Sequence, residues 1–100
     1  MPEDRETQAE PLLALAPMAR LRWDRKDGRY LLLSPERGLA LNDTATLVVK
    51  LCDGTRTTAA VIAECIRSHG GAPAERIEQD VRTLLTQLRA RGLVLGYSEG

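Results

Sequence analysis

Hydrophobic and polar positions alternate over residues 19–24 as they do in a half-buried β-strand. Leu21 and Trp23 would share one face of a first strand, with charged side chains on the other face. Gly28 favours a tight hairpin turn after this strand, because glycine adopts positive φ without strain. The returning strand, residues 29–33, holds three consecutive leucines. Such a run indicates cover on both faces or a central place in the sheet.

A proline turn leads to a third expected strand of four uncharged residues, Gly38, Leu39, Ala40 and Leu41. In a three-stranded meander the first and third strands are the outer ones, and an open outer edge can pair with an added strand. The first strand carries charges that discourage such pairing, whereas the third carries none. We therefore expect the third strand to be the receptive edge, unless the N-terminal arm or a helix covers it.

A helix is predicted after the third strand. Asn42, Asp43 or Thr44 can cap its first turn, and Asp53 and Gly54 favour its end. Its apolar positions cover an arc of roughly 200°, which is wider than the stripe of an ordinary surface helix. The helix is therefore expected to be central in the fold or partly covered by a partner.

Two further helices complete the pattern. One begins at Thr57 or Thr58 and stops at Gly70, and the other follows Pro73 and ends at Gly92. The last helix carries its apolar residues within one arc of about 100°, as an amphipathic helix does. A short apolar strand or tail follows it.

Three antiparallel strands followed by three helices predict an α+β domain of winged-helix type. We expect a flexible N-terminal arm at residues 1–16, the folded domain at residues 17–95 and a C-terminal tail at residues 96–100. Three leucines at residues 12–15 form an apolar knot within the arm. The knot is expected to dock on its own domain or on a second copy of the chain.

Composition narrows the range of partners. Fourteen basic and fourteen acidic residues cancel, so the chain has no overall charge with which to hold nucleic acid or an anionic membrane surface. Cys52 and Cys65 lack a CxxC spacing, so neither a disulfide framework nor a zinc site is expected, and a cytoplasmic location fits. The apolar run from Pro11 to Pro17 is far too short to cross a membrane.

The sequence predicts neither a catalytic site nor a metal site. The single histidine, His69, falls at the expected end of the second helix, where it favours the helix dipole or solvent. Cys52 and Cys65 are expected to behave as small core hydrophobes, with redox sensing as the alternative. No glycine-rich phosphate-binding motif occurs, and no set of residues offers the nucleophile, base or metal ligands that an enzyme requires.

The winged-helix outline leaves a second function open, that of a DNA-binding or regulatory module. Its third helix would then place basic or amide side chains in a major groove. In this chain the arginines of that helix are offset by acidic residues, and pairs such as Glu78 with Arg82 indicate a solvated helix face.

Four segments between residues 17 and 95 carry a family likeness: RLRWD, LLLSPERGLALN, LCDGTRT and IEQDVRTLLTQLRARGLV. In these segments the chain resembles the PqqD family, the small peptide chaperones of pyrroloquinoline quinone (PQQ) biosynthesis. More broadly, it is similar to the recognition elements that hold the leader peptides of ribosomally made, modified peptides. The acidic N-terminal arm lies outside the likeness.

The resemblance implies a noncatalytic adaptor with no cofactor of its own. In that family a precursor peptide adds as a strand to the third β-strand, in the cleft between that strand and the third helix. Carried over, the peptide-binding residues are Gly38, Leu39, Ala40 and Leu41 from the strand and Asp80, Val81, Leu84 and Leu85 from the helix. The adaptor presents the peptide to a radical S-adenosylmethionine enzyme, which holds the iron–sulfur chemistry and joins a glutamate to a tyrosine within the peptide.

Two points stay open at the level of sequence. The broad first helix and the apolar arm allow a homodimer or an exchanged strand. The domain could also serve a modified peptide other than the precursor of PQQ.

Overall fold

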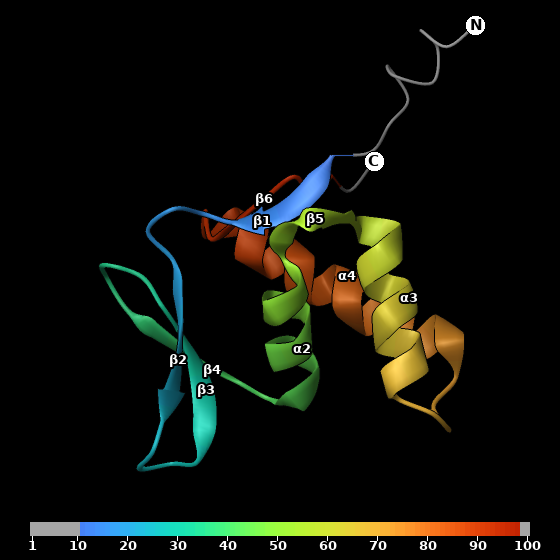
Figure 1. Ribbon diagram of the computed structural model, residues 1–100, viewed down its shortest axis with the longest axis horizontal. Helices are drawn as coiled ribbons and strands as arrows, with labels where there is room; N and C mark the ends of the chain where they lie inside the picture. The colour runs from blue at the N-terminus through green and yellow to red at the C-terminus, as the bar shows by residue number, and fades with distance from the viewer. Residues whose placement is uncertain (1–10, 99–100) are drawn as a thin grey trace, which may run out of the picture.

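The computed structural model describes residues 11–98, so the expectations for residues 1–10 and 99–100 lie outside it. The described part contains two three-stranded antiparallel sheets and three helices, which confirms the predicted α+β class. Figure 1 shows one sheet beside the helices and strand β1 of the other sheet crossing above them. The elements in chain order are β1 (Leu12–Leu15), β2 (Arg20–Asp24), β3 (Arg29–Leu33), β4 (Gly38–Leu41), α2 (Asp43–Leu51), β5 (Asp53–Thr57), α3 (Thr58–Ser68), α4 (Ala74–Ala90) and β6 (Val94–Leu95).

The first sheet is the predicted meander, with the strand order β2-β3-β4. Strand β3 is therefore central, which explains its run of leucines. The register pairs Leu32 with Leu21 on β2 and with Leu39 on β4, so these three side chains share a face. Leu32 is only 1% exposed, and we call the face to which it belongs the inner face. Gly28 turns the β2–β3 hairpin with a φ of +67°, as its sequence predicts.

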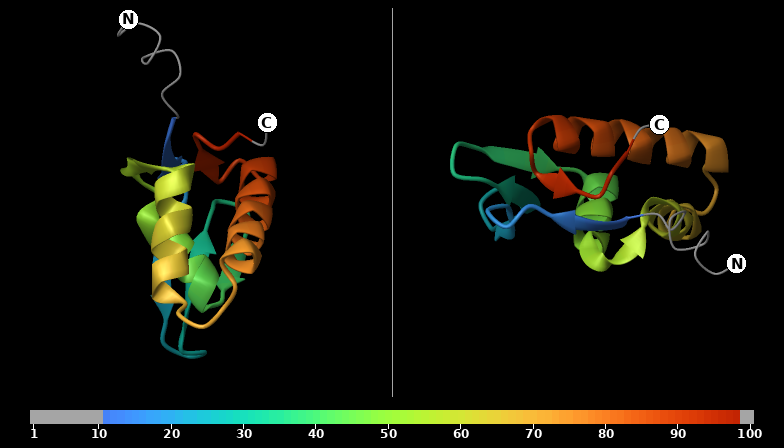
Figure 2. Two further views of the ribbon diagram at one scale, coloured as in Figure 1. Left: turned by 90° about the vertical axis from the view of Figure 1, so that its right-hand side faces the viewer. Right: turned by 90° about the horizontal axis from the view of Figure 1, so that it is seen from above.

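The helices begin and end at residues that the sequence indicates. The Asn42 side chain caps α2 and the Thr57 hydroxyl caps α3, each accepting a hydrogen bond from the backbone N–H three residues further on. Pro73 precedes α4, and Gly92 follows its C-terminal cap with a φ of +72°. Figure 2 shows α3 and α4 running side by side, joined by a short loop.

A second sheet, with the order β5-β1-β6, is a feature that the sequence analysis missed. Its central strand β1 lies within residues 1–16, which were expected to form a flexible arm. That expectation is wrong for residues 11–16, which belong to the folded domain. Leu13 is fully buried. The Leu15 N–H donates to the carbonyl oxygen of Cys52 at 3.1 Å, and the Ala16 N–H donates to that of Leu93 at 2.9 Å. The leucine knot thus docks on its own domain.

The predicted C-terminal tail is also wrong in its first residues. Tyr97 is only 6% exposed, and its hydroxyl lies 3.5 Å from the backbone carbonyl oxygen of Arg82 on α4. The folded part of the chain therefore continues past β6. Helix α2 ends at Leu51, with Cys52 as its C-terminal cap, so the end expected at Asp53 and Gly54 comes slightly earlier. Those two residues instead begin strand β5.

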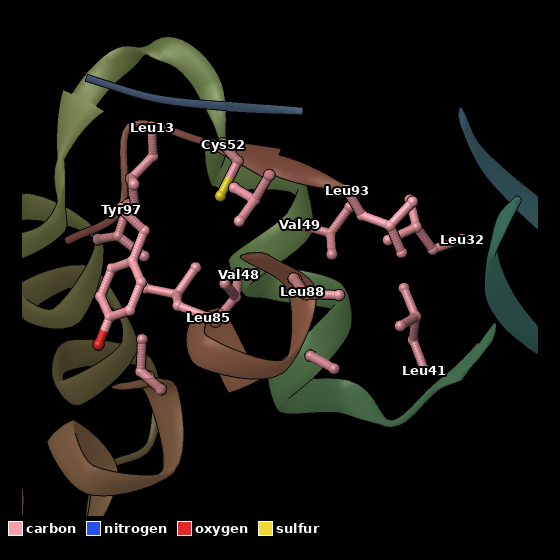
Figure 3. Packing of buried hydrophobic residues seen from close by; sticks show 14 of the residues in the cluster. Leu13, Leu32, Leu41, Val48, Val49, Cys52, Leu85, Leu88, Leu93 and Tyr97 are labelled. Carbon is pink, nitrogen blue, oxygen red and sulfur yellow. The ribbon is translucent and has the colours of Figure 1, made fainter. Parts of the chain in front are cut away.

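The hydrophobic core lies between the inner face of the first sheet and the helices, and extends to Leu13 and Val94 of the second sheet. Leu32 and Leu41 reach from the sheet toward Leu88 of α4, Leu93 after it and Val49 of α2 (Figure 3). Each of these five side chains is no more than 6% exposed. The leucines and Val49 therefore join the sheet to the helices through apolar contact.

The burial of β1 predicts a stability difference between two neighbouring leucines. Leu13→Ala should lower the free energy of unfolding by about 2 to 5 kcal/mol, because it leaves a cavity in the core. Leu12, which is 49% exposed, provides the matched control, and Leu12→Ala should cost less than about 1 kcal/mol. Urea unfolding followed by circular dichroism measures both values. Equal midpoints for the two variants and the wild type would mean that this segment is an arm after all.

Candidate functional site

Strand β4 forms one edge of the first sheet. Among the described residues it pairs with β3 on one side and with no strand on the other. The alternative that the N-terminal arm covers this edge does not hold for residues 11–16, because β1 pairs with β5 and β6 instead. Strand β4 is therefore an outer strand of the sheet, as the sequence predicts.

The hydrogen-bond pattern of the β3–β4 ladder determines which backbone groups face outward. The Ser34 N–H donates to the carbonyl oxygen of Arg37 at 2.9 Å and so closes the turn between the strands. Residue pairs along an antiparallel ladder alternate between hydrogen-bonded and non-hydrogen-bonded. Counting from this closing pair, Leu39 bonds to β3, whereas the N–H and C=O groups of Gly38 and Ala40 are directed to the free edge. Those two residues can bond to an added strand.

The side chains of β4 divide between the two faces of the sheet. Leu41 is buried, with 4% exposure, and Leu39 is half-buried against the same core. Ala40 is exposed on the outer face. Leu39 is thus the β4 leucine whose surface remains available to a peptide.

Helix α4 contributes fewer accessible residues than the family resemblance implies. Leu84 is half-buried and packs against the core, and Asp80 is exposed. Val81 and Leu85, in contrast, are both 0% exposed. A peptide on the surface cannot touch these two side chains in this conformation. They pack in the core and so hold α4 in place. Leu84 and Asp80 remain as the expected contacts from α4.

The turn between β3 and β4 lies close to the end of α4. A hollow of about 420 Å³ is lined by Ser34, Glu36 and Arg37 from the turn and by Arg91 and Leu93 from the other side. It offers two guanidinium groups that suit a carboxylate. More than fifty positions separate Arg37 from Arg91 in the chain, so only the tertiary structure brings the two side chains together.

Both ring nitrogens of His69 lie within hydrogen-bond distance of groups in the fold. Its Nδ1 lies 2.9 Å from the carbonyl oxygen of Cys65, and its Nε2 lies 2.9 Å from the Thr44 hydroxyl. Since a carbonyl oxygen only accepts, Nδ1 carries the proton, and in the neutral ring Nε2 accepts from Thr44. The ring thus links the C-terminal end of α3 to the first turn of α2.

Both cysteines are free thiols inside the core, with Cys52 at 3% and Cys65 at 0% exposure. Burial raises the pKa of the Cys52 thiol to about 12, with a smaller contribution from the charge of Asp53. Burial likewise raises the pKa of Cys65. Because the thiolate is the reactive form, neither group suits redox sensing at neutral pH.

The exposed surface of α4 has the charge pairing that the sequence predicts. The Arg82 Nε lies 3.0 Å from a Glu78 carboxylate oxygen, and this hydrogen bond raises the pKa of Arg82. Within residues 11–98, no three potential metal ligands gather in one place. Every helix in that range falls short of the length and apolarity that a membrane span requires.

Sequence comparisons identify similar proteins over most of the chain. The family model described as coenzyme PQQ synthesis protein D (PqqD) matches residues 29–94. A PqqA binding protein of Methylococcus capsulatus is 33% identical over 87 residues, which cover 87% of this chain and 90% of that protein. A PqqA binding protein of Xanthomonas campestris is 38% identical over 81 residues, which cover 81% and 87% of the two chains.

Solved structures share the fold. The solution structure of the PqqD part of Methylobacterium extorquens PqqCD, a stand-alone recognition element for ribosomally synthesised and modified peptides, matches with a TM-score of 0.68 and 29% identity. The match covers 89% of this chain and 97% of that one. A lasso peptide synthetase B1 complexed with its leader peptide matches with a TM-score of 0.68 and 26% identity, over 84% and 98% of the two chains.

The buried thiols predict slow alkylation. In the folded protein at pH 8, Cys52 and Cys65 should react with iodoacetamide far more slowly than in urea, because both are buried and their raised pKa values suppress the thiolate. Mass spectrometry of timed samples measures the two rates site by site. Fast modification of either cysteine in the native protein would restore redox sensing as a candidate role.

Proposed function

The chain belongs to the PqqD family, and from this premise we propose that it is a noncatalytic peptide chaperone of PQQ biosynthesis. It binds the precursor peptide as an added strand on β4, in the cleft between β4 and α4. It then presents the peptide to a radical S-adenosylmethionine enzyme in the cytoplasm, a location with which two free thiols agree.

The observation that carries this proposal is the open edge of β4, on which Leu39 is only half-buried. Gly38 and Ala40 direct backbone groups outward, and Leu39 and Leu84 expose part of their apolar surface next to the core. The PqqA binding proteins similar to this chain, and the synthetase solved with its leader peptide, support a peptide as the occupant. One copy of the chain supplies all of these groups, so the proposal does not require the homodimer that the sequence leaves open.

Backbone pairing alone does not hold a flexible peptide. Three or four added hydrogen bonds contribute about 0.5 to 1.5 kcal/mol each, whereas ordering each peptide residue costs about 1 to 2 kcal/mol. Apolar anchors that bury fully contribute about 1.5 to 3 kcal/mol each. Micromolar affinity requires about 8 kcal/mol in total, so contacts with Leu39 and Leu84 must supplement the edge.

The chaperone affects the enzyme's reaction only by positioning the peptide. A disordered peptide held on β4 loses conformational freedom before it meets the enzyme, and its local concentration at the enzyme rises. The reaction itself, including the iron–sulfur chemistry, belongs to the enzyme. This division assigns this chain a binding role and no catalytic residue.

A substitution at Ala40 tests the edge directly. Ala40→Pro removes one outward N–H without breaking a bond to β3, so it should weaken peptide binding about fivefold or more, equivalent to about 1 kcal/mol. Ala40→Val retains the N–H and suits a strand, so its affinity should stay near that of the wild type. Isothermal titration with a synthetic precursor peptide provides both values. Equal affinities for the two variants would move the peptide away from this edge.

A substitution at Leu39 tests the apolar anchor. Leu39→Asp replaces a half-buried apolar side chain with a charge and should reduce peptide affinity by about 30-fold or more, equivalent to about 2 kcal/mol. Arg82→Ala removes only a surface ion pair and should have little effect. Far-UV circular dichroism checks that each variant remains folded. Undiminished binding by a folded Leu39→Asp protein would contradict the proposed site.

A further inference from the structure

An exposed aromatic group lies at the opposite edge of the first sheet. Trp23, on the edge strand β2, is the chain's single tryptophan and is 48% exposed. Its ring meets that of Tyr30 edge to face, with 4.9 Å between centroids, and the Lys50 ammonium lies 4.5 Å from the centre of the Tyr30 ring. Two of the three aromatic residues of the chain thus gather at one exposed place, whereas the third, Tyr97, is buried.

Two hollows of about 360 Å³ each adjoin Trp23. One lies between the inner face of the sheet and α2 and includes Leu41 and Leu47 in its lining. The other lies against the outer face and includes Leu31 and Leu33. Trp23 therefore stands between two partly apolar depressions that can receive side chains of another molecule.

The hairpin around Trp23 is positively charged. Residues 20–29 carry five basic and two acidic side chains, a net charge of +3 in a chain whose formal net charge is zero. Both acidic groups already have partners within the hairpin. Asp27 pairs with Arg29 at 3.4 Å, and the Asp24 carboxylate accepts a hydrogen bond from the Lys26 backbone N–H at 3.1 Å. The surplus of positive charge is therefore available to a partner.

This surface lies on the opposite edge of the sheet from the proposed peptide site, and Leu41, the β4 residue in the lining of one hollow, is only 4% exposed. β2 and β4 are the two edges of the same sheet, with β3 between them. At a spacing of about 4.8 Å between neighbouring strands, the two edges lie about 10 Å apart, and a strand added to β4 lies further away still. A peptide on β4 leaves Trp23 and its basic neighbours uncovered, so both surfaces can be occupied at once.

The chemistry of the surface favours an acidic protein over other occupants. Tryptophan, tyrosine and arginine are the residues that most often dominate the binding energy of protein interfaces. A second copy of this chain would bring an equal positive charge against the first and be repelled. Nucleic acid is a long polyanion, and this chain, with a formal net charge of zero, has no overall positive field with which to hold one.

We propose that this β2–β3 hairpin surface docks an acidic face of the enzyme that modifies the peptide. The surface consists of Arg22, Trp23, Arg25, Lys26, Tyr30 and Lys50. The identity of the partner rests on the proposed function, whereas the surface itself does not. The chain then bridges its two partners through opposite edges of one small sheet, with the peptide on β4 and the enzyme on the β2 side.

Fluorine NMR provides a direct readout at the centre of this surface. Because the chain has one tryptophan, labelling it with 5-fluorotryptophan gives one resonance, from Trp23. Adding the unlabelled radical S-adenosylmethionine enzyme of the pathway should shift or broaden this resonance, and adding synthetic precursor peptide alone should leave it nearly unchanged. A resonance that does not respond to a bound enzyme would overturn the proposal.

Charge reversal tests the basic part of the surface. Arg25→Glu combined with Lys26→Glu should weaken enzyme binding about tenfold or more, while peptide affinity stays within about twofold of wild type because the two sites are far apart. Arg56→Glu combined with Arg67→Glu, on β5 and α3, makes the same change in net charge elsewhere and should bind the enzyme normally. Equal enzyme affinity for both double variants would overturn the proposal.

Two more measurements separate this inference from the proposed function and from other partners. A folded Leu39→Asp protein should lose the peptide but still bind the enzyme. Failure of the wild type to bind the peptide, with enzyme docking intact, would overturn the proposed function alone. A labelled single-stranded oligonucleotide should not bind at either low or high salt. Tight, salt-dependent binding that the Arg25→Glu and Lys26→Glu changes abolish would assign the surface to nucleic acid instead.

Discussion

The apolar inner face of the small β2-β3-β4 sheet holds this sheet to the helices. Leu32 and Leu41 pack against Val49, Leu88 and the segment after α4. On the opposite face, Leu31 and Leu33 are half-buried and Ala40 is exposed. Since side chains alternate along a strand, a slip of one residue in β4 would turn Leu41 outward. Burial of the inner face therefore fixes the register of β4. The register in turn fixes which backbone groups reach the free edge, so the chemistry of the edge depends on the packing behind it.

Local pattern predicts the parts of the fold that form through local contacts. Alternation predicts the meander, a period of 3.6 predicts the helices, and Asn42 and Thr57 cap where the sequence indicates. The second sheet could not be predicted in this way. Its strands pair residues that are far apart in the chain, such as Leu12 with Thr57, and β5 is polar and contains a glycine. No local periodicity marks such strands.

The part of the candidate site on strand β4 could be predicted from the sequence, and the part on helix α4 less so. An uncharged outer strand after a proline turn identifies Leu39 and Ala40 from sequence alone. Val81 and Leu85 belong to the same helix face as Leu84, and nothing in the sequence separates a fully buried position from one at the border of that face. The exposure of Trp23 could not be predicted either, because the alternation places Trp23 with Leu21 on the inner face of the sheet.

The central position of β1 has a consequence for biosynthesis. Its partners are residues 53–57 and 94–95, so this sheet joins the beginning of the described chain to its end. A ribosome adds about 5 to 20 residues per second, and Leu13 emerges several seconds before its last neighbours exist. Closing such long loops also slows folding relative to local contacts. The nascent chain is consequently vulnerable to proteases and to aggregation until translation is almost finished.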